Sequence, residues 1–168
     1  MLDDVTFMKE ALKEAQEAFQ AGEVPIGAVL VDAEDTIVAR AHNMRETWHD
    51  GTAHAEIIAL QEAARKLGRW RLSGLTLYVT IEPCPMCAGA LVMSRVDRVV
   101  YGATDAKAGA CESLFNIVRH PALNHQLEMR AGVLEDECRA IMKRFFRQRR
   151  KKSSALKKCA NQAFDAPE

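Results

Sequence analysis

The chain has 168 residues, nearly half of them apolar, which is enough for one domain with a single hydrophobic core. Its N-terminus carries acids where a secretory leader needs a basic start, and no apolar run is long enough to cross a bilayer, so we expect a cytoplasmic protein without a membrane span. Five cysteines make an odd count, and two form a Cys-x-x-Cys, which in such a chain favours metal or redox chemistry over disulfides.

The formal net charge of zero conceals an uneven distribution. Residues 143–158 contain nine Lys or Arg and no acid, which leaves 14 basic against 23 acidic residues in the rest of the chain. A basic segment on an acidic body is typical of a local contact with a polyanion. The simpler interpretation is a solvated helix end, because cations suit the C-termini of helices, and composition alone favours it.

The first quarter of the chain predicts a helix followed by a β-hairpin. Apolar residues recur at helical spacing within residues 4–21. The runs 24–32 and 36–43 are rich in β-branched residues and enclose a turn-like segment at 33–35. We therefore expect two paired strands after the helix.

The middle of the chain alternates helices and strands. After a polar loop over 44–53, residues 54–68 show the apolar spacing of a helix that closes at a glycine. Residues 76–82 alternate and are β-branched, as in a strand. Residues 83–94 predict a helix whose prolines stand before or within its first turn.

The last third of the chain ends in a helix. Two strands are predicted over 96–103 and 127–132, with a candidate short helix over 113–118 between them. An apolar stripe that begins at Leu134 predicts the C-terminal helix. Its periodicity fades, and we expect residues 159–168 to form a disordered tail.

This order of elements predicts an α/β fold with three layers, α/β/α, around a mixed sheet of about five strands. No internal repeat or linker divides the chain. Residues 1–158 are therefore expected to form a single domain.

His54, Cys84 and Cys87 stand at the predicted starts of two helices. Three residues apart in a first helical turn, the two sulfurs lie on one side, and the positive helix end favours the thiolate that a metal requires. Structural zinc sites are usually closed by four protein ligands, whereas catalytic sites leave the fourth position to water. A set of one imidazole and two thiols therefore predicts a catalytic Zn²⁺ site.

Glu56 follows His54 by two residues. At that spacing its side chain points away from the ligand face, so we expect it to carry protons above the metal rather than to bind it. Zinc lowers the pKa of a bound water, but hydrolysis also needs a group that moves protons to the substrate. Glu56 is the candidate for that role.

Each of these residues also has an ordinary structural interpretation. His54 fits a hydrogen-bonded core histidine, Glu56 a first-turn acid that suits the helix dipole, and the Cys-x-x-Cys either a pair of apolar fillers or a redox pair. Their combination at two helix starts favours the metal site. Of the other cysteines, Cys138 fits the apolar stripe, Cys159 lies in the basic segment, and Cys111 stays unassigned.

His54-Ala55-Glu56 followed by Pro83-Cys84-Pro85-Met86-Cys87 resembles the signature of the cytidine deaminase superfamily. Over about residues 5–152 the chain is also similar to the bacterial tRNA-specific adenosine deaminases. The resemblance implies a cytidine deaminase-like fold, a homodimer with one Zn²⁺ per subunit, and hydrolytic conversion of adenosine to inosine at the wobble position of a tRNA anticodon. The stretches that carry it are EVPIGAVLV, TAHAEI, TLYVTIEPCPMCAGAL, GATDAKAGA, HPALNH and FFRQRR.

The resemblance also implies roles around the target nucleoside. Glu56 would protonate the adenine ring and later the leaving ammonia, and the backbone N–H of Ala55 would stabilise the tetrahedral oxygen. Asn43 would contact the nucleoside, although alone it fits a turn-favouring residue at a strand end. Asp105 and Lys107 would contact the sugar and backbone beside the target, and a solvated loop is their simpler interpretation.

The remaining implied contacts to the anticodon stem-loop lie toward the C-terminus. A His ring or Asn amide can stack on or bond an unpaired base, and a basic helix can meet phosphates, although each residue alone also fits an ordinary surface. Glu112 departs from the family pattern, in which a small residue is common at this position. The implied contacts are His120, Asn124, His125, Phe146, Arg147, Arg149 and Arg150.

Two other functions are compatible with the sequence. A deaminase of a free base or nucleoside, of the guanine or cytosine type, would share the metal site but would not need the basic C-terminal helix. A non-enzymatic RNA-binding or redox module would use the Cys-x-x-Cys and keep its function without Glu56.

Overall fold

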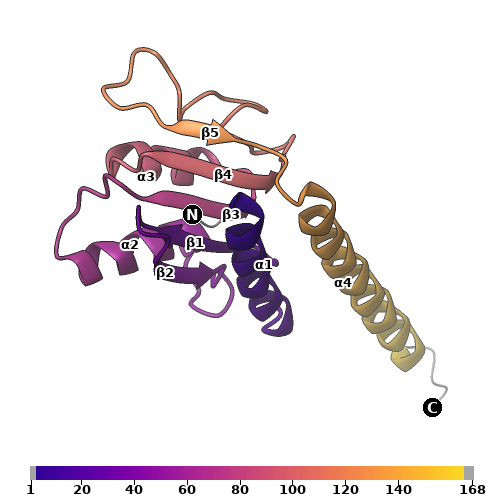
Figure 1. Ribbon diagram of the computed structural model, residues 1–168. Coiled ribbons are helices and arrows are strands. Elements are labelled where there is room, and N and C mark those ends of the chain that lie inside the picture. The colour runs from indigo at the N-terminus through magenta and orange to yellow at the C-terminus, as the bar shows by residue number, and fades with distance from the viewer. Residues whose placement is uncertain (1–2, 165–168) are drawn as a thin grey trace.

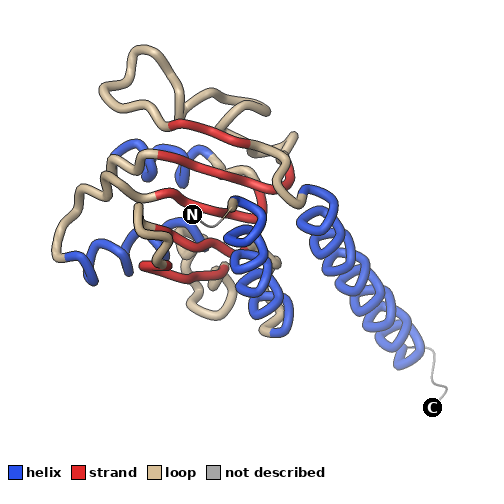
Figure 2. The backbone as a smooth tube through the Cα atoms, in the orientation of Figure 1, coloured by secondary structure: helices blue, strands red, loops and turns tan. Residues whose placement is uncertain are grey.

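The computed structural model describes residues 3–164 of the chain. Five strands form one mixed sheet in the order β2-β1-β3-β4-β5, with helices on both faces (Figure 1, Figure 2). This confirms the α/β class and the number of strands expected from the sequence. The elements are α1 (Asp4–Gln20), β1 (Gly27–Val31), β2 (Ile37–His42), α2 (Ala55–Leu67), β3 (Thr76–Ile81), α3 (Pro85–Met93), β4 (Arg98–Ala103), β5 (Glu128–Arg130) and α4 (Glu135–Phe164).

The strand directions bring several chain segments to one edge of the sheet. β1 pairs antiparallel with both β2 and β3, which confirms the hairpin, whereas β4 runs parallel to β3 and β5 parallel to β4. Ile81 at the end of β3 lies beside Ala103 at the end of β4. We call this edge, where the parallel strands end, the carboxyl edge. The residues that directly follow β3 and β4 therefore lie close together.

Alternate side chains of the strands pack under two helical layers. Ala28 and Leu30 of β1 belong to the core beneath α2 and α3, whereas Val29 and Val31 belong to the core beneath α1 and α4. Successive side chains of a strand point to opposite faces, so a strand covered on both faces has a continuous apolar sequence. The run GAVLV of β1 is fully buried for this reason.

Side chains at the helix ends explain several boundaries. Asp3 caps α1, because its carboxylate accepts the backbone N–H of Thr6 at 2.8 Å. Helix α2 ends at Gly68, whose φ of +64° is a left-handed conformation that glycine adopts without a steric penalty. His54 and Cys84 occupy the positions directly before α2 and α3, each with an extended backbone.

Residues 113–118 form an irregular loop with turns at its ends, and not the short helix that the sequence suggests. The Glu82 carboxylate accepts the backbone N–H groups of Cys111, Glu112 and Ser113. The N–H groups of Leu114 and Ile117 donate to Gly109 O and Ala110 O at 2.9 and 3.0 Å, and not to the carbonyl groups four residues earlier. These contacts with the preceding loop replace the hydrogen bonds of a helix.

Helix α4 is longer than the sequence indicated. It continues to Phe164, whereas an irregular tail was expected from residue 159 onward, and residues 165–168 of that tail lie outside the described part of the chain. No Gly or Pro interrupts residues 133–164, so no residue type forces the helix to end earlier.

Helix α4 packs on the sheet only along its first turns. Cys138, Ile141 and Phe145 are buried, and every residue from 146 to 162 is exposed. Figure 1 shows the yellow end of the helix extending away from the sheet. Among the described residues, the helices are too short or too polar to cross a membrane.

Candidate metal centre and active site

The N-termini of α2 and α3 meet at the carboxyl edge. His54 stands at the start of α2, Cys84 at the start of α3, and Cys87 in the first turn of α3. Pro85 suits the first position of α3, because the N–H that it lacks would have no partner within the helix. The ligand atoms of the one histidine and the two cysteines all lie within 4.8 Å of one another. The fold thus brings together the three predicted metal ligands.

The distances between these atoms fit a zinc ion. His54 Nδ1 lies 3.6 Å from Cys84 Sγ and 3.5 Å from Cys87 Sγ. Zn–S bonds of about 2.3 Å and Zn–N bonds of about 2.1 Å in a tetrahedron place neighbouring ligand atoms about 3.6 Å apart. The ligand cluster found in the described residues has three members, so it leaves the fourth position open, as in catalytic zinc sites.

Charges around the ligands favour metal binding. The neighbouring Cys87 thiol lowers the pKa of Cys84 to about 4, and the same contact raises the pKa of Cys87. The contact with Cys84 also raises the pKa of His54. The three ligand groups thus share protons through their mutual contacts. A metal cation that binds to them displaces these protons.

Glu56 lies beside the ligand cluster at the start of α2. Its carboxylate accepts from the Cys87 thiol at 3.0 Å, and the residue is only 4% exposed. Burial raises the pKa of the Glu56 carboxyl, because the charged form loses hydration. A carboxyl that holds a proton more readily than an exposed glutamate is suited to general acid–base catalysis.

A cavity of about 90 Å³ opens beside the ligands. A few polar groups facing apolar side chains are typical of a site for a small molecule or a single base. The sequence anticipated four of its members and missed the apolar pair and Arg45. The cavity is lined by Val24, Ile26, Asn43, Arg45, His54, Ala55 and Glu56.

The missed residues reach the cavity through contacts between two loops. The backbone N–H of Asn43 donates to Ile26 O at 3.1 Å, and the Asn43 amide donates to Val24 O at 3.4 Å. The Asn43 side-chain oxygen also accepts the N–H of Arg45 at 3.1 Å. The β-branched content of Val24-Pro25-Ile26 predicts a strand, but these residues precede β1 as a loop, and Val24 and Ile26 form part of the cavity wall.

The buried Glu23 holds the loop that leads to His54. Glu23 is 1% exposed, and its carboxylate accepts the N–H of Thr47 at 2.6 Å, the Thr47 hydroxyl at 3.0 Å and the N–H of Glu46 at 3.2 Å. A buried carboxylate with these donors is stable only in one loop conformation. In the sequence, an acid directly after a helix-ending glycine looks like an ordinary surface residue.

Glu82 holds the loop on the other side of the metal ligands. It is 3% exposed and directly precedes Pro83-Cys84. Although burial alone raises the pKa of Glu82, hydrogen bonds led by that from Ser113 lower it below its ordinary value. A Cβ at Gly109 would collide with this carboxylate, so only glycine fits there. The N–H donors are those of Cys111, Glu112 and Ser113 at 3.0–3.1 Å and of Asp105 at 3.2 Å.

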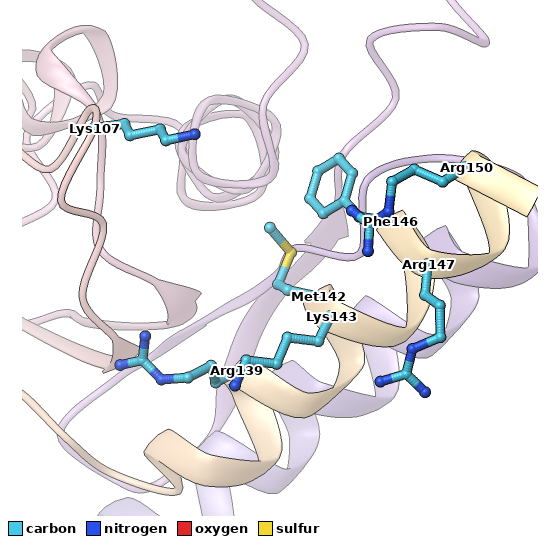
Figure 3. A pocket seen from close by; sticks show the side chains of 7 residues that line it. All are labelled: Lys107, Arg139, Met142, Lys143, Phe146, Arg147 and Arg150. Carbon is cyan, nitrogen blue, oxygen red and sulfur yellow. The ribbon is translucent and has the colours of Figure 1, made fainter.

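A larger groove of about 770 Å³ lies between the loop after β4 and helix α4 (Figure 3). In Figure 3, Lys107 extends from that loop on the side opposite the helix residues. A neighbouring hollow shares Lys107 and Phe146 and reaches Ile81 at the carboxyl edge. Five of the seven residues that line the groove are cations and none is an acid. The lining residues are Lys107, Arg139, Met142, Lys143, Phe146, Arg147 and Arg150.

The remaining candidate RNA contacts near the carboxyl edge have other surroundings. The Arg149 guanidinium lies over the Phe145 ring at 5.8 Å and lines a separate hollow with Phe19. The Asp105 carboxylate accepts the N–H of Lys107 at 3.0 Å and thereby shapes the turn that presents this lysine. The arginines of the FFRQRR run are therefore divided between two sides of α4.

His120, Asn124 and His125 lie on the loop that leads into β5. Because β5 is parallel to β4, this loop ends at the edge opposite the carboxyl edge. His125 Nε2 lies 2.6 Å from the carbonyl oxygen of Val96, just before β4. Within one chain, His125 is therefore remote from the cavity.

The structure also places the cysteines and the acid that stood apart from the site. Cys138 is buried, as its stripe predicted, and Cys111 is buried in the core beneath α2 and α3. Cys159 is exposed on α4. Glu112 accepts the hydroxyl of the buried Tyr101, so its departure from the family pattern serves a local hydrogen bond.

Comparison with known proteins agrees with this geometry. The family model of the MafB19-like deaminases matches residues 2–150. The tRNA-specific adenosine deaminase of Bacillus subtilis (strain 168) is 54% identical over 158 residues, which are 94% of this chain and 98% of the relative.

Two solved structures have a similar fold. One, from a study of A-to-I editing by tRNA:A34 deaminases at the wobble position of transfer RNA, superposes with a TM-score of 0.78 at 44% identity over 81% of this chain and 98% of the other. The guanine deaminase of Bacillus subtilis superposes with a TM-score of 0.60 at 35% identity over 76% of this chain and 83% of the other. On this family match and these identities, the chain belongs to the MafB19-like deaminases and, among them, to the tRNA-specific adenosine deaminases.

Proposed function

We propose that the protein hydrolyses the 6-amino group of an adenosine at the wobble position of a tRNA anticodon, which yields inosine and ammonia. The observation that carries the proposal is the juxtaposition of the three-ligand cluster with the cavity that contains the buried Glu56. In this reaction water adds to C6 of the base, the C6–N bond breaks, and the departing amine takes up a proton.

His54, Cys84 and Cys87 are proposed to hold one Zn²⁺ per subunit. A zinc ion with three protein ligands supplies an acidified water as the nucleophile. His54 offers its Nδ1 atom to the cluster, since this nitrogen faces both sulfurs. The positive ends of α2 and α3 favour the two thiolates.

Glu56 is proposed to move the protons. Its carboxyl lies both beside the ligands and in the cavity wall. It can therefore take one proton from the attacking water and deliver it to the adenine ring, and then take the remaining proton of the added hydroxyl and deliver it to the leaving amine. The backbone N–H of Ala55, at the start of α2, is proposed to stabilise the oxygen that develops negative charge. Asn43 is proposed to orient the nucleoside from the opposite loop.

The groove on α4 is proposed to bind RNA beside the target. Lys107, Phe146, Arg147 and Arg150 combine cations with one exposed ring, a combination that suits phosphates and an unstacked base. Asp105 supports the turn of Lys107. Arg149 is proposed to contribute through long-range charge, since its guanidinium already lies on Phe145.

A homodimer is part of the proposal. Met93, Leu114 and Phe115 are more than half exposed apolar side chains that a subunit interface would cover. The dimer also gives His120, Asn124 and His125 a role, as contacts to RNA bound at the partner's cavity. Light scattering should then report twice the chain mass of 18.7 kDa. A monomeric mass would contradict this part of the proposal.

A cytoplasmic location follows from the proposed substrate.

The test compares Glu56→Gln with Glu62→Gln, which removes a partly exposed acid two turns along the same helix. An anticodon stem-loop with a wobble adenosine is incubated with each protein, and products are read by mass spectrometry. Glu56→Gln should keep one zinc per subunit and lose at least about 10²-fold in turnover, whereas Glu62→Gln should match the unaltered protein. Full turnover by the Glu56 variant would contradict the assignment.

A deaminase of a free base is the second candidate, because the similar guanine deaminase shares the fold at 35% identity. Such an enzyme has no need of the cationic groove. Free guanine, cytosine, cytidine and adenosine are therefore assayed beside the RNA. Turnover of a free base without turnover of the RNA would favour this second candidate.

A further inference from the structure

The exposed part of α4 carries charge without internal compensation. Residues 138–164 contain ten Lys or Arg and no acid. Like charges three or four residues apart destabilise a helix that has no packing partner. All residues from 146 to 162 are exposed, so neither the body of the protein nor an acid in the helix offsets this repulsion. A polyanionic partner would offset it.

Most of these cations form one continuous line along the helix. The groove of Figure 3 contains Arg139, Lys143, Arg147 and Arg150. A second hollow of about 390 Å³ shares Arg147 and Arg150 and continues along the helix. The spacing of three and four residues places these side chains on one face. We call this line the cationic track: Arg139, Lys143, Arg147, Arg150, Lys151 and Lys158.

Two further cations of α4, Arg149 and Lys152, lie on a different side, and Arg144 has partners in the body of the protein. The Arg144 guanidinium lies over the Phe19 ring at 4.8 Å and donates to Gln16 at 3.1 Å. Lys152 lines the hollow that contains Phe19 and Arg149. The helix therefore has one side turned to α1 and another side, the cationic track, turned away from it.

The track begins at the active-site end of the sheet and leads away from it. The chain enters α4 through backbone contacts with the end of β4, where Gly132 N–H donates to Gly102 O at 3.2 Å. From Arg139 to Lys158 the helix rises about 28 Å, at about 1.5 Å per residue. Only a long polyanion can contact the metal cavity at one end and Lys158 at the other.

We propose that the far half of the cationic track, from Arg147 to Lys158, binds backbone phosphates of the base-paired anticodon stem, beyond the loop that enters the cavity. The inference rests on the proposed RNA substrate and extends its footprint. Phosphates of a duplex have fixed positions along a straight rod, and double-stranded RNA is recognised mainly through its backbone and shape. A straight helix with cations on one face is complementary to such a rod.

The test uses two RNAs with the same loop and wobble adenosine. One is a hairpin with the complete anticodon stem, and the other is a covalently closed loop without a stem. The variant Lys151→Ala/Lys158→Ala removes two cations from the track. The control Lys9→Ala/Lys152→Ala causes the same change in net charge, since it removes one exposed lysine from α1 and one from the opposite side of α4.

On the hairpin, the track variant should raise KM about ten-fold at low salt and leave kcat unchanged, because phosphate contacts contribute uniform binding. The slope of log kcat/KM against log salt should fall by about two, roughly one for each lysine. On the closed loop, the variant and the unaltered protein should agree. The control should match the unaltered protein on both RNAs.

An equal loss on both RNAs would overturn the assignment to the stem, and so would an unchanged KM on the hairpin. Both results would leave the proposed function standing, because the unaltered protein would still deaminate the hairpin. Absence of turnover on both RNAs by the unaltered protein would instead reject the proposed function, and the inference with it.

Discussion

The metal cavity and the far half of α4 are built by opposite means. At the cavity, Glu23 and Glu82 are almost wholly buried and each fixes a loop through several hydrogen bonds. Along α4 beyond Phe145, every described side chain up to residue 162 is exposed and no acid is present. Chemistry at one base needs atoms held within fractions of an ångström, whereas attraction to phosphates needs only charge of one sign along a line.

Loss of a metal ligand should have the largest effect and should stay confined to the cavity. We expect Cys87→Ala to reduce bound zinc from one per subunit to below detection and to abolish turnover, because two ligands do not hold the ion against water. Metal analysis and the stem-loop assay measure both effects. Cys159→Ala, an exposed cysteine on α4, should change neither. Zinc retained by the Cys87 variant would show that another group completes the site.

Replacement of Glu82 should loosen the cavity without touching a ligand. In the native protein, four backbone N–H groups donate to the two oxygens of the Glu82 carboxylate. In Glu82→Gln, an NH₂ group replaces one of these oxygens, so that a hydrogen-bond donor then faces backbone donors. We expect a loss of about 2–3 kcal/mol in the free energy of unfolding by urea, together with weaker zinc binding. Glu128→Gln is the matched control, since its side chain is 74% exposed, and it should cost less than about 1 kcal/mol. Equal losses in the two variants would refute the role of Glu82.

Replacement of Asp4 should have a smaller effect on the free energy of unfolding. Because Asp4 lies away from the cavity, this variant tests whether zinc binding depends on the stability of the whole domain. Hydrogen bonds from Arg98, supported by Tyr78 and Arg130, hold the pKa of Asp4 well below its usual range. Stability from a lowered carboxyl pKa is complete above the unfolded pKa of about 3.9 and is lost as the pH falls toward the folded value. Asp4→Asn should therefore cost about 1–2 kcal/mol at neutral pH, and its free energy of unfolding should vary less with pH below about 4.

Urea titrations of the Asp4 variant from neutral pH downward measure this difference. Zinc content and kcat at neutral pH should stay unchanged, because Asp4 and Arg98 lie toward the amino ends of α1 and β4, away from the carboxyl edge. A parallel loss of zinc would mean that the cavity depends on global stability rather than on its own loops.

Local patterns in the sequence determined the elements and the chemistry of this protein. Helical spacing, β-branched runs and the residues at helix starts predicted each main helix and strand within a few residues, apart from the far end of α4. They also placed His54, Cys84 and Cys87 at two helix starts, where their distances fit a metal. These signals are visible because the interacting residues stand within a few positions of each other.

Tertiary structure decided what depends on contacts between distant segments. Arg45 enters the cavity because Asn43 bonds the loop before β1. Residues 113–118 are not helical because Leu114 and Ile117 donate to Gly109 and Ala110 instead of to the residues four positions earlier. Arg149 and Arg150 are adjacent in sequence, yet they lie on different sides of α4 because only one side of that helix meets α1 and Phe19. A buried carboxylate and a surface one have the same sequence signal, and only packing distinguishes them, because packing removes water from one and leaves it around the other.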